Sequence, residues 1–427
     1  MMEPRLSERL RGIIGSPAGT TVPAPAVNDA HAAGPGIHDL AALGGEWRDN
    51  CFVVERRKSA AAVHGREAVG VLADRLQQAS ADAPMLAGGT PAIPPFVFFD
   101  LETTGLSGGA GTYAFLVGCG WFDDGSFVTR QFLLTRFSDE RALLSAVRAE
   151  LARAGALVSF NGKSFDAPLL ETRYLFHRLE WIGACLPHVD VLHPARRFWS
   201  PQGSTSAAGS CSLGALEQQV LAARRSGDIP GFEIPERYFR FVRSGDARPL
   251  AAVLEHNRLD LLSLAGLTAR LLELVRSGPA SARSAREALA LGHVYTRSGF
   301  DTRARDAYAH AIAASRAPIG AFDAVKVDGL RALALAWRRA RQYEEAANCW
   351  QQLLEVRGCP PHIAREATDA LAIHHEHRKR DLAAAKLFAL RSLETGTDPA
   401  RSDAARHRLA RLDRKIALSA PLSSFLS

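Results

Sequence analysis

Long apolar runs and closely spaced cysteine pairs are absent from this chain of 427 residues. No stretch approaches the roughly 18 consecutive apolar residues that a membrane span needs. The first residues carry charges of both signs and lack the apolar core of a secretory signal. The six cysteines form no C-x-x-C pair and no zinc-ligand spacing, which indicates reduced thiols. We therefore expect a cytoplasmic protein without a membrane partner.

An excess of acidic residues is also missing, since the formal net charge is +7. A positive balance suits a polyanionic partner such as nucleic acid, although an arginine-rich composition alone produces a similar value. Hydrophobic residues make up 47% and charged residues 23% of the chain, which is typical of a globular protein rather than a disordered one. At this length two domains are expected.

The composition divides the chain into three parts. Residues 1–44 include the Pro/Ala/Gly-rich stretch 16–36, which has no apolar periodicity and predicts a disordered segment with a linker. Residues 45–278 carry mixed strand and helix signals. Residues 283–415 are Ala- and Arg-rich, with aromatic anchors about 40 residues apart, near the ~34 of a tetratricopeptide repeat. We expect helical repeats of that kind there, and an ordinary helical bundle is the alternative. The anchors are Tyr308, Trp350 and Phe388.

The central part has the pattern of an α/β fold. Three strand-like runs are followed by a helix, a strand and a second helix, which is the opening of an RNase H-like sheet flanked by helices. Ser138 is the expected N-cap of the first helix. The expected strands cover 96–101, 113–122, 126–135 and 156–160, and the expected helices cover 138–154 and 167–179.

The first of these strands ends in two acids. In Phe96–Leu106, four apolar residues lead into Asp100 and Glu102, and the turn residues 103–105 follow. Strand side chains alternate between faces, so the two carboxylates project to the same side, about 7 Å apart at ~3.3 Å per residue. Carboxylates that repel each other and lose water are tolerated mainly when a cation lies between them. A strand end with two solvated acids is the alternative.

Two later segments carry further acids. Asp166 follows the strand 156–160 through a glycine turn, at a helix start where a lone Asp is commonly an N-cap. His256 and Asp260 lie in a long helix expected over 249–275, and they share one of its faces because they are separated by i,i+4. A surface salt bridge is the alternative for this pair. Together the three segments favour a metal-binding acid cluster.

The motifs DLETTG, N-G-x-x-F-D and H-N-x-x-D, in this order, resemble the three motifs of the DEDD superfamily of 3′–5′ exonucleases, within the RNase H-like fold. The segments ETTGLSGGAGTYAFLVG, SFNGKSFDAPLLETR, CSLGALE, DIPG and VLEHNRLDLLSL are similar to the bacterial family of predicted exonucleases with a tetratricopeptide tail. The resemblance covers residues 45–275 well and the tail more loosely. It implies an RNase H-like exonuclease domain with core motifs over 96–275, followed by an all-α repeat domain.

The resemblance also implies metal ligands and a general base. The four residues that match its metal-binding carboxylates, for two Mg²⁺ or Mn²⁺ ions, are Asp100, Glu102, Asp166 and Asp260. His256 falls where the family has its general base. Histidine-type members place that His five residues before the last Asp and tyrosine-type members place a Tyr four before it, so this chain has a His at the tyrosine-type spacing. One residue on a helix is a rotation of about 100°. Asn257 belongs to the same pattern, without a role that its chemistry identifies.

Substrate contacts are expected from the motif turns and from basic segments. Thr103 and Thr104 are similar in position to the family's substrate-facing turn. Phe165 is either a core residue or a wall beside a base. Arginines track phosphates and aromatics stack on bases, and solvated helix faces are the alternative for the basic segments. The further candidates are Asn161, Arg196, Arg197, Arg224, Arg225 and Arg237, the aromatics Phe198, Trp199, Tyr238 and Phe239, and Asp190 as a fifth acid.

Hydrolysis of a phosphodiester needs an activated water and a stabilised leaving oxygen, and two divalent ions supply both. We therefore expect a metal-dependent 3′–5′ exonuclease acting on single-stranded nucleic acid, with the polarity implied by the resemblance alone. A structure-specific endonuclease of the same fold is the alternative within nuclease chemistry. A nucleic-acid-binding scaffold, whose repeat tail recruits a protein partner, is the alternative from another class.

Overall fold

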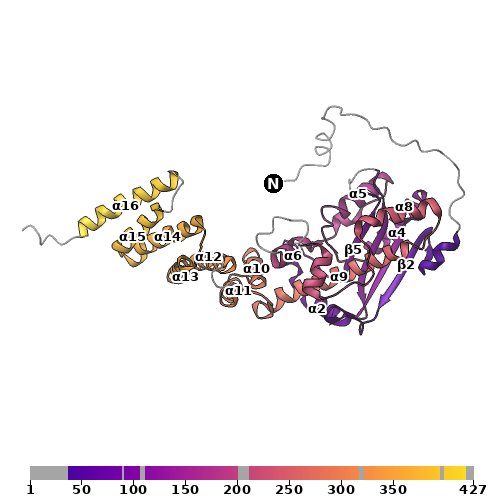
Figure 1. Cartoon of the computed structure of the whole chain (residues 1–427), viewed down its shortest axis with the longest axis horizontal. Coiled ribbons are helices and arrows are strands. Elements are labelled where there is room, and N and C mark those ends of the chain that lie inside the picture. The colour runs from indigo at the N-terminus through magenta and orange to yellow at the C-terminus, as the bar shows by residue number, and fades with distance from the viewer. Residues whose placement is uncertain are drawn as a thin grey trace, which may run out of the picture.

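A seven-stranded sheet lies at one end of the molecule, and helices alone continue from it to the other end (Figure 1). This computed structural model describes residues 37–88, 91–105, 111–200, 211–316, 322–394 and 399–419. The expected order, an α/β domain followed by an all-helical region, is confirmed. Of the segment expected to be disordered, 1–36 lies outside the described residues, whereas Ile37–Leu43 forms a 3-10 helix with Leu40 and Leu43 buried.

The sheet has the strand order β1-β2-β7-β6-β5-β8-β9. The pairs β5–β8 and β8–β9 are parallel, and the other neighbours are antiparallel. Asp124 and Gly125, both with positive φ, form the hairpin turn between β6 and β7. A separate short hairpin joins β3 to β4. The strands are β1 (Glu46–Arg48), β2 (Cys51–Lys58), β3 (Val63–His64), β4 (Glu67–Ala68), β5 (Phe96–Thr103), β6 (Ala114–Asp123), β7 (Ser126–Leu133), β8 (Ala156–Ser159) and β9 (His188–Asp190).

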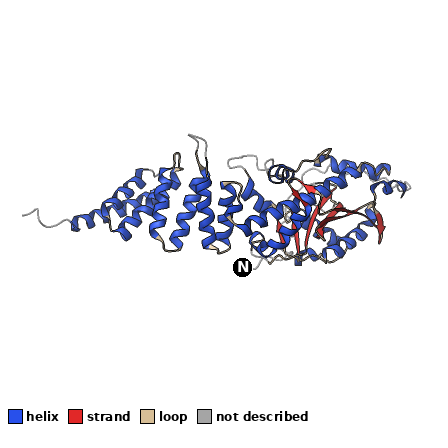
Figure 2. Ribbon diagram, turned by 90° about the horizontal axis from the view of Figure 1, so that it is seen from below, coloured by secondary structure: helices blue, strands red, loops and turns tan. Residues whose placement is uncertain are grey.

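Helices cover both faces of the sheet (Figure 2). They are α2 (Val69–Ala79), α3 (Ala83–Leu86), α4 (Glu140–Leu151), α5 (Asp166–Phe176), α6 (Leu192–Trp199), α7 (Leu213–Leu216), α8 (Ile234–Ser244) and α9 (Leu250–Ser277). Along β5, Phe96 and Phe98 enter a core with α2 and α9, whereas Val97 and Phe99 enter a second core with α4 and α8. A strand buried on both faces has a continuous apolar run. Asp100 continues the face of Phe98 and therefore turns toward α9.

The helix α4 begins later than its sequence pattern predicts. Residues Phe137–Asp139 form a 3-10 turn, and the α-helix starts at Glu140. Ser138 donates its hydroxyl to the carboxylate of Asp139 instead of accepting a bond from a helical N–H. The N-cap prediction for Ser138 was therefore wrong, because the 3-10 turn places the start of α4 beyond the reach of this side chain.

The rest of the chain is a row of helices, each packed on its neighbour (Figure 2). A Cβ on Gly292 would lie 2.4 Å from the ring of Tyr308, so glycine permits the close contact between the first two helices. Tyr308 and Trp350 are buried, and Phe388 is half-buried. No described helix combines the length and apolar character needed to cross a bilayer. The helices are α10 (Ala285–Arg297), α11 (Asp301–Ala314), α12 (Ala324–Arg339), α13 (Tyr343–Glu355), α14 (Pro361–His374), α15 (Leu382–Glu394) and α16 (Pro399–Ser419).

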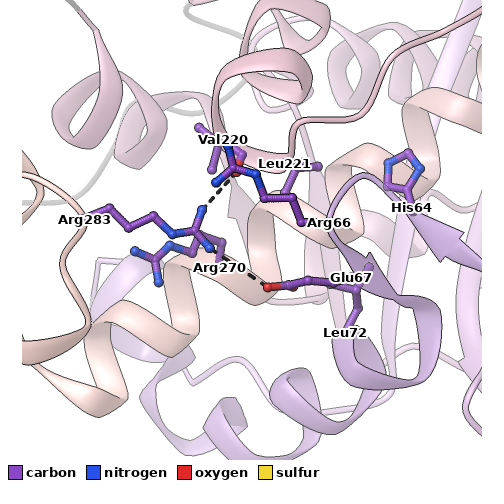
Figure 3. A pocket seen from close by; sticks show the side chains of 8 residues that line it. All are labelled: His64, Arg66, Glu67, Leu72, Val220, Leu221, Arg270 and Arg283. Atoms are coloured by element: carbon purple, nitrogen blue, oxygen red, sulfur yellow. Dashed lines mark hydrogen bonds and ion pairs between the residues drawn. The ribbon is translucent and has the colours of Figure 1, made fainter.

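Charged side chains fasten this helical region to the sheet domain. The carboxylate of Glu287, on α10, accepts hydrogen bonds from Trp199 Nε1 at 2.8 Å and from Arg270 at 2.9 Å. Arg283, just before α10, donates to the carbonyl of Val220 at 3.0 Å and faces Glu67 of the β3–β4 hairpin (Figure 3). The two parts therefore meet through buried ion pairs and not through apolar contact alone.

Candidate functional site

Four carboxylates from three elements gather at one end of the sheet. Burial, and then the charges of Asp260, Glu102 and Asp166, raise the pKa of Asp100 well above its usual range. Burial, followed by the charges of Asp260 and Asp166, raises the pKa of Glu102 to about 8. The pKa of Asp166, the first residue of α5, rises to about 7 through burial and the charge of Asp190. These shifts show that the carboxylates lie close enough to repel one another.

Asn257, on α9, holds the carboxylate of Asp100 in position. Its Nδ2 donates to Asp100 Oδ2 at 2.9 Å and approaches the Asp100 carbonyl at 3.3 Å. Its Oδ1 accepts from Gln131 Nε2 at 2.9 Å. Asn257 and Gln131 are both buried, so this amide chain has no access to bulk water. The pattern residue that lacked a role in the sequence therefore orients a central carboxylate.

Asp260 is paired with Arg225, which comes from the loop after the π-helical turn η5 (Glu217–Leu221). The same guanidinium donates to Glu217 at 2.7 Å and to Asp228 at 3.1 Å. Burial opposes its charge, but Glu217 and Asp260 hold the pKa of Arg225 above its ordinary value. Arg225 thus serves as a cation on one side of the acid cluster, in addition to any metal that binds there.

His256 lies between two carboxylates. Its Nδ1 is 2.7 Å from Asp228 Oδ1, and its Nε2 is 3.4 Å from Asp260 Oδ2. Burial favours the neutral form of Asp228, but the hydrogen bond from His256, the neighbouring positive charges and the N–H of Ile229 together outweigh it and lower the pKa of that carboxyl. Asp228 therefore fixes the orientation of the imidazole. The i,i+4 pairing with Asp260, expected from the sequence, is present in the structure.

The four carboxylates have the oxygen ligands of a divalent-cation site, but they do not converge on a single point. Among the described residues, no three His, Cys, Asp or Glu side chains are grouped tightly enough to hold a metal ion as they stand. The bond from Arg225 to Asp260 accounts for part of this. Oxygen ligands that repel one another in a buried site nevertheless fit a hard cation such as Mg²⁺ or Mn²⁺.

Comparison with known proteins agrees with this geometry. Residues 97–272, which include all four carboxylates, match the model of the RNase H superfamily. This part of the chain is an RNase H superfamily domain. It is also 31% identical over 325 residues to the uncharacterized protein YprB of Bacillus subtilis (strain 168), an alignment that covers 74% of each chain. RNase H-like nucleases generally use divalent metal ions, and a nuclease-like domain implies a nucleic-acid substrate.

In this RNase H domain, Asp190 has a structural contact set. Its carboxylate accepts hydrogen bonds from the backbone N–H groups of Asn161 at 2.8 Å, Lys163 at 3.1 Å and Leu192 at 3.1 Å. These bonds hold the turn before α5, where Asn161 has a left-handed φ of 69°. Asp190 therefore positions the loop that carries Asp166, and its negative charge contributes to the raised pKa of Asp166.

The threonines of the first motif shape the turn after β5. Thr103 Oγ1 donates to the carbonyl of Gly105 at 3.0 Å, and Thr104 Oγ1 accepts from the N–H of Tyr113 at 3.0 Å. Phe165 precedes Asp166 and is 62% exposed, so its alternative as a core residue is wrong. An exposed ring beside the acids is available for contact with a base.

The basic segments divide into exposed and structural groups. Arg196 and Arg197 lie on the exposed side of α6. Phe198 and Tyr238 are fully buried, so neither ring stacks on a base. Trp199 is bonded to Glu287 of the helical region. The sequence suggested these aromatics as base contacts because they are interleaved with arginines, with solvated helix faces as the alternative, and burial assigns them to the core and the domain junction instead.

Three residues of the site had no assigned role at the level of sequence. Gln131 holds Asn257 from β7, and no sequence signal indicated it. Asp228 and Glu217 lie in the DIPG and CSLGALE segments, whose presence was noted without roles for their acids. Both acids bind Arg225, which the sequence suggested as a substrate contact.

Proposed function

We propose that the protein is a divalent-metal-dependent 3′–5′ exonuclease that acts on the ends of single-stranded DNA or RNA. One observation carries the proposal: four carboxylates, from β5, α5 and α9, converge within an RNase H superfamily domain, where burial and neighbouring acids raise the pKa values of Asp100, Glu102 and Asp166. Buried carboxylates that repel one another destabilise the site unless a cation compensates them. Such a site suits phosphodiester hydrolysis, in which cations also face the phosphate.

The proposed site holds two ions, Mg²⁺ or Mn²⁺, and its ligands are Asp100, Glu102, Asp166 and Asp260. When bound, such ions supply an activated water and stabilise the leaving oxygen. Asn257 keeps Asp100 turned toward the cluster through its 2.9 Å bond. If an ion took the place of Arg225 at Asp260, the bonds of Arg225 to Glu217 and Asp228 would keep its guanidinium nearby, and Asp260 would still face a cation.

His256 is the proposed proton acceptor. With the Nδ1 proton directed at Asp228, Nε2 is the basic nitrogen, and it faces Asp260 at 3.4 Å. An imidazole oriented by a carboxylate at Nδ1, with its basic Nε2 directed at the proposed metal ligands, is suited to general-base catalysis. This support does not depend on the spacing that distinguishes histidine-type from tyrosine-type relatives.

The proposed substrate contacts lie around the acids. Phe165 offers an exposed ring for the terminal base, and Thr103 and Thr104 form the turn beside it. Asn161 lies in the turn that carries Asp166. Arg196 and Arg197, exposed on α6, are proposed to contact phosphates further along the strand.

The remaining proposals concern the domains and the setting. We place the nuclease domain at 45–278 and tetratricopeptide-like repeats at 283–415, with a protein partner in the repeat groove. The contact of Gly292 with Tyr308 supports the first repeat, since both positions belong to its pattern. All six cysteines are free thiols, which supports a cytoplasmic setting.

The test is cleavage of single-stranded DNA and RNA, labelled at either the 5′ or the 3′ end, in Mg²⁺ or Mn²⁺. We expect a ladder that shortens from the 3′ end and that disappears in Asp100→Asn. Asp124→Asn is the matched control, because Asp124 is an exposed acid on the β6–β7 turn, remote from the cluster in the fold.

Other outcomes redirect the proposal in defined ways. Cleavage of circular single strands identifies an endonuclease. Binding of labelled strands without cleavage in either metal identifies a scaffold. Equal activity of Asp100→Asn and the Asp124→Asn control removes the acid cluster from the chemistry.

A further inference from the structure

A second cleft lies next to the acid site and is lined by cations. It measures about 390 Å³, and its walls include Lys58, His64, Arg224 and Arg225. The neighbouring cleft, about 320 Å³, is lined by Asp228, His256 and Asp260. Both clefts share Arg225, with Glu217 and Ala223 beside it. One guanidinium therefore separates the proposed site of hydrolysis from a positively charged recess.

The charges of this recess are not balanced. Two carboxylates line it, but Glu217 is bonded to Arg225 and Glu255 is bonded to Arg258 at 2.7 Å. Within the described parts of the chain, Lys58 and Arg224 form no ion pair with a carboxylate. Burial and the charge of Arg258 lower the pKa of Lys58. Lys58 and Arg224 are therefore cations of the recess without a bonded carboxylate, and Glu255 acts on Lys58 through its charge alone.

The buried side chain of His64, which also lines the recess, is affected by the same positive charges. Burial, and then the charges of Lys58, Arg225 and Arg258, lower the pKa of this imidazole to about 4. Its Nε2 is 3.0 Å from Ser263 Oγ, and the β3–β4 hairpin that carries it is drawn in Figure 3. In addition to burial, three cations act on this imidazole, which indicates a positive potential on this side of the recess.

The backbone that carries the arginines is unusual. The π-helical turn Glu217–Leu221 ends at Ala222, which has a left-handed φ of 55°. The Leu221 carbonyl accepts the N–H of Arg66 at 3.0 Å, which ties this turn to the β3–β4 hairpin. Rare backbone conformations of this kind concentrate at functional sites. Here they hold Arg224 and Arg225 at the mouth of the recess.

We infer that this recess binds a phosphate of the nucleic-acid strand, next to the phosphodiester at the acid cluster, with Lys58 and Arg224 as the contacting cations. The inference rests on the proposed function and extends it to the path of the substrate. Lys58 ends β2 and lies outside the residues 97–272 that match the superfamily. The contact of Lys58 with the nucleic acid therefore uses a part of the sheet that precedes the residues matched to the superfamily model.

The experiment measures strand binding in the full chain carrying Asp100→Asn, so that turnover does not consume the ligand. Fluorescence anisotropy with a labelled single-stranded oligonucleotide in Mg²⁺ is recorded over a range of salt. The test variant adds Lys58→Ala and Arg224→Ala. The control adds Arg57→Ala, because Arg57 neighbours Lys58 on β2 but is exposed and paired with Asp123.

We expect the double substitution to weaken binding and to reduce the slope of log K against log salt by about 0.7 to 1.4, the value for one or two phosphate contacts on a single strand. The Arg57→Ala control keeps the original slope. Equal slopes in all three proteins, with binding retained, overturn the recess assignment and leave the exonuclease proposal standing. Absence of binding at every salt concentration overturns both.

A free nucleotide offers the same phosphate chemistry as the strand. The second arm therefore titrates a nucleoside 5′-monophosphate against the same proteins. If the double substitution abolishes nucleotide binding but leaves strand binding unchanged, the recess holds the released product and the strand assignment is overturned. If strand binding weakens in the double variant whatever the nucleotide does, the assignment is supported.

Discussion

The side-chain amide of Asn257 donates a hydrogen bond to Asp100 at 2.9 Å across 157 positions of sequence. This bond joins the long helix α9 to the central strand β5 at the acid cluster. Because Asn257 is wholly buried and also bound to Gln131, it fixes which way the Asp100 carboxylate points. The acid cluster is therefore organised by a neutral residue as much as by its charged members.

Replacing Asn257 with Ala is expected to remove both amide bonds and leave Gln131 and Asp100 without this partner. A buried polar group left without its partner costs about 1–3 kcal/mol, so the free energy of unfolding should fall by about that amount. Strand cleavage should also slow, since Asp100 loses its orientation. Urea unfolding and initial cleavage rates measure the two effects. Unchanged cleavage at full metal occupancy would contradict the positioning role.

Gly118, on β6, tests the same contact from the other side. A Cβ there would lie 2.1 Å from Asn257 Oδ1, so Gly118→Ala has to displace the amide. Overpacking of this kind costs about 1–3 kcal/mol. Gly231→Ala is the matched control, because nothing lies within 4 Å of a Cβ at that position. Thermal unfolding of the two variants should differ clearly, and equal midpoints would count against a tight fit around Asn257.

Arg225 compensates the negative charges of Glu217 and Asp260. In Arg225→Ala the carboxylate of Glu217, only 2% exposed, loses its cation. An uncompensated buried charge costs about 3–5 kcal/mol, so the metal-free variant should unfold much more easily than Arg224→Ala, whose arginine is exposed. Asp260 also loses its arginine in this variant, and Mn²⁺ should reduce that part of the loss of stability because the ion compensates Asp260. If the loss is the same in chelator and in Mn²⁺, Arg225 and the ion do not share Asp260 as a partner.

The depressed pKa of His64 predicts a loss of stability in acid. The folded protein holds this imidazole neutral down to about pH 4, whereas an unfolded His binds a proton near pH 6.5. Between these values the unfolded state binds more protons, so stability is complete above pH 6.5 and is lost as the pH falls toward 4. Between pH 7.5 and 5 the loss is about 2 kcal/mol. His64→Gln should lack this component when urea unfolding is compared at the two pH values.

Local periodicity made much of the fold legible in the sequence. The alternation along Phe96–Thr103 predicted that Asp100 and Glu102 share a face, and β5 has that pattern. The i,i+4 spacing predicted that His256 and Asp260 meet on α9, and they do. Both relations depend on a few neighbouring residues, whose geometry a strand or helix sets. The order of strands and helices identified the RNase H-like sheet for the same reason.

Contacts between segments that are distant in the sequence could not be predicted from local spacing. No spacing in the sequence links Arg225 to Asp260 or Lys58 to Arg224, because the sheet order and the turn after η5 bring these segments together. Burial also divided residues that composition treated alike, since Phe165 is exposed while Phe198 and Tyr238 are in the core.

The sequence by itself determined the acids, their order and the elements that carry them. Only the tertiary structure decided how they are compensated: Asn257 holds Asp100, Arg225 holds Asp260, and Asp228 orients His256. The physical reason is that side-chain identity and backbone period are local properties. Desolvation and charge pairing, in contrast, depend on which distant surfaces the fold presses together.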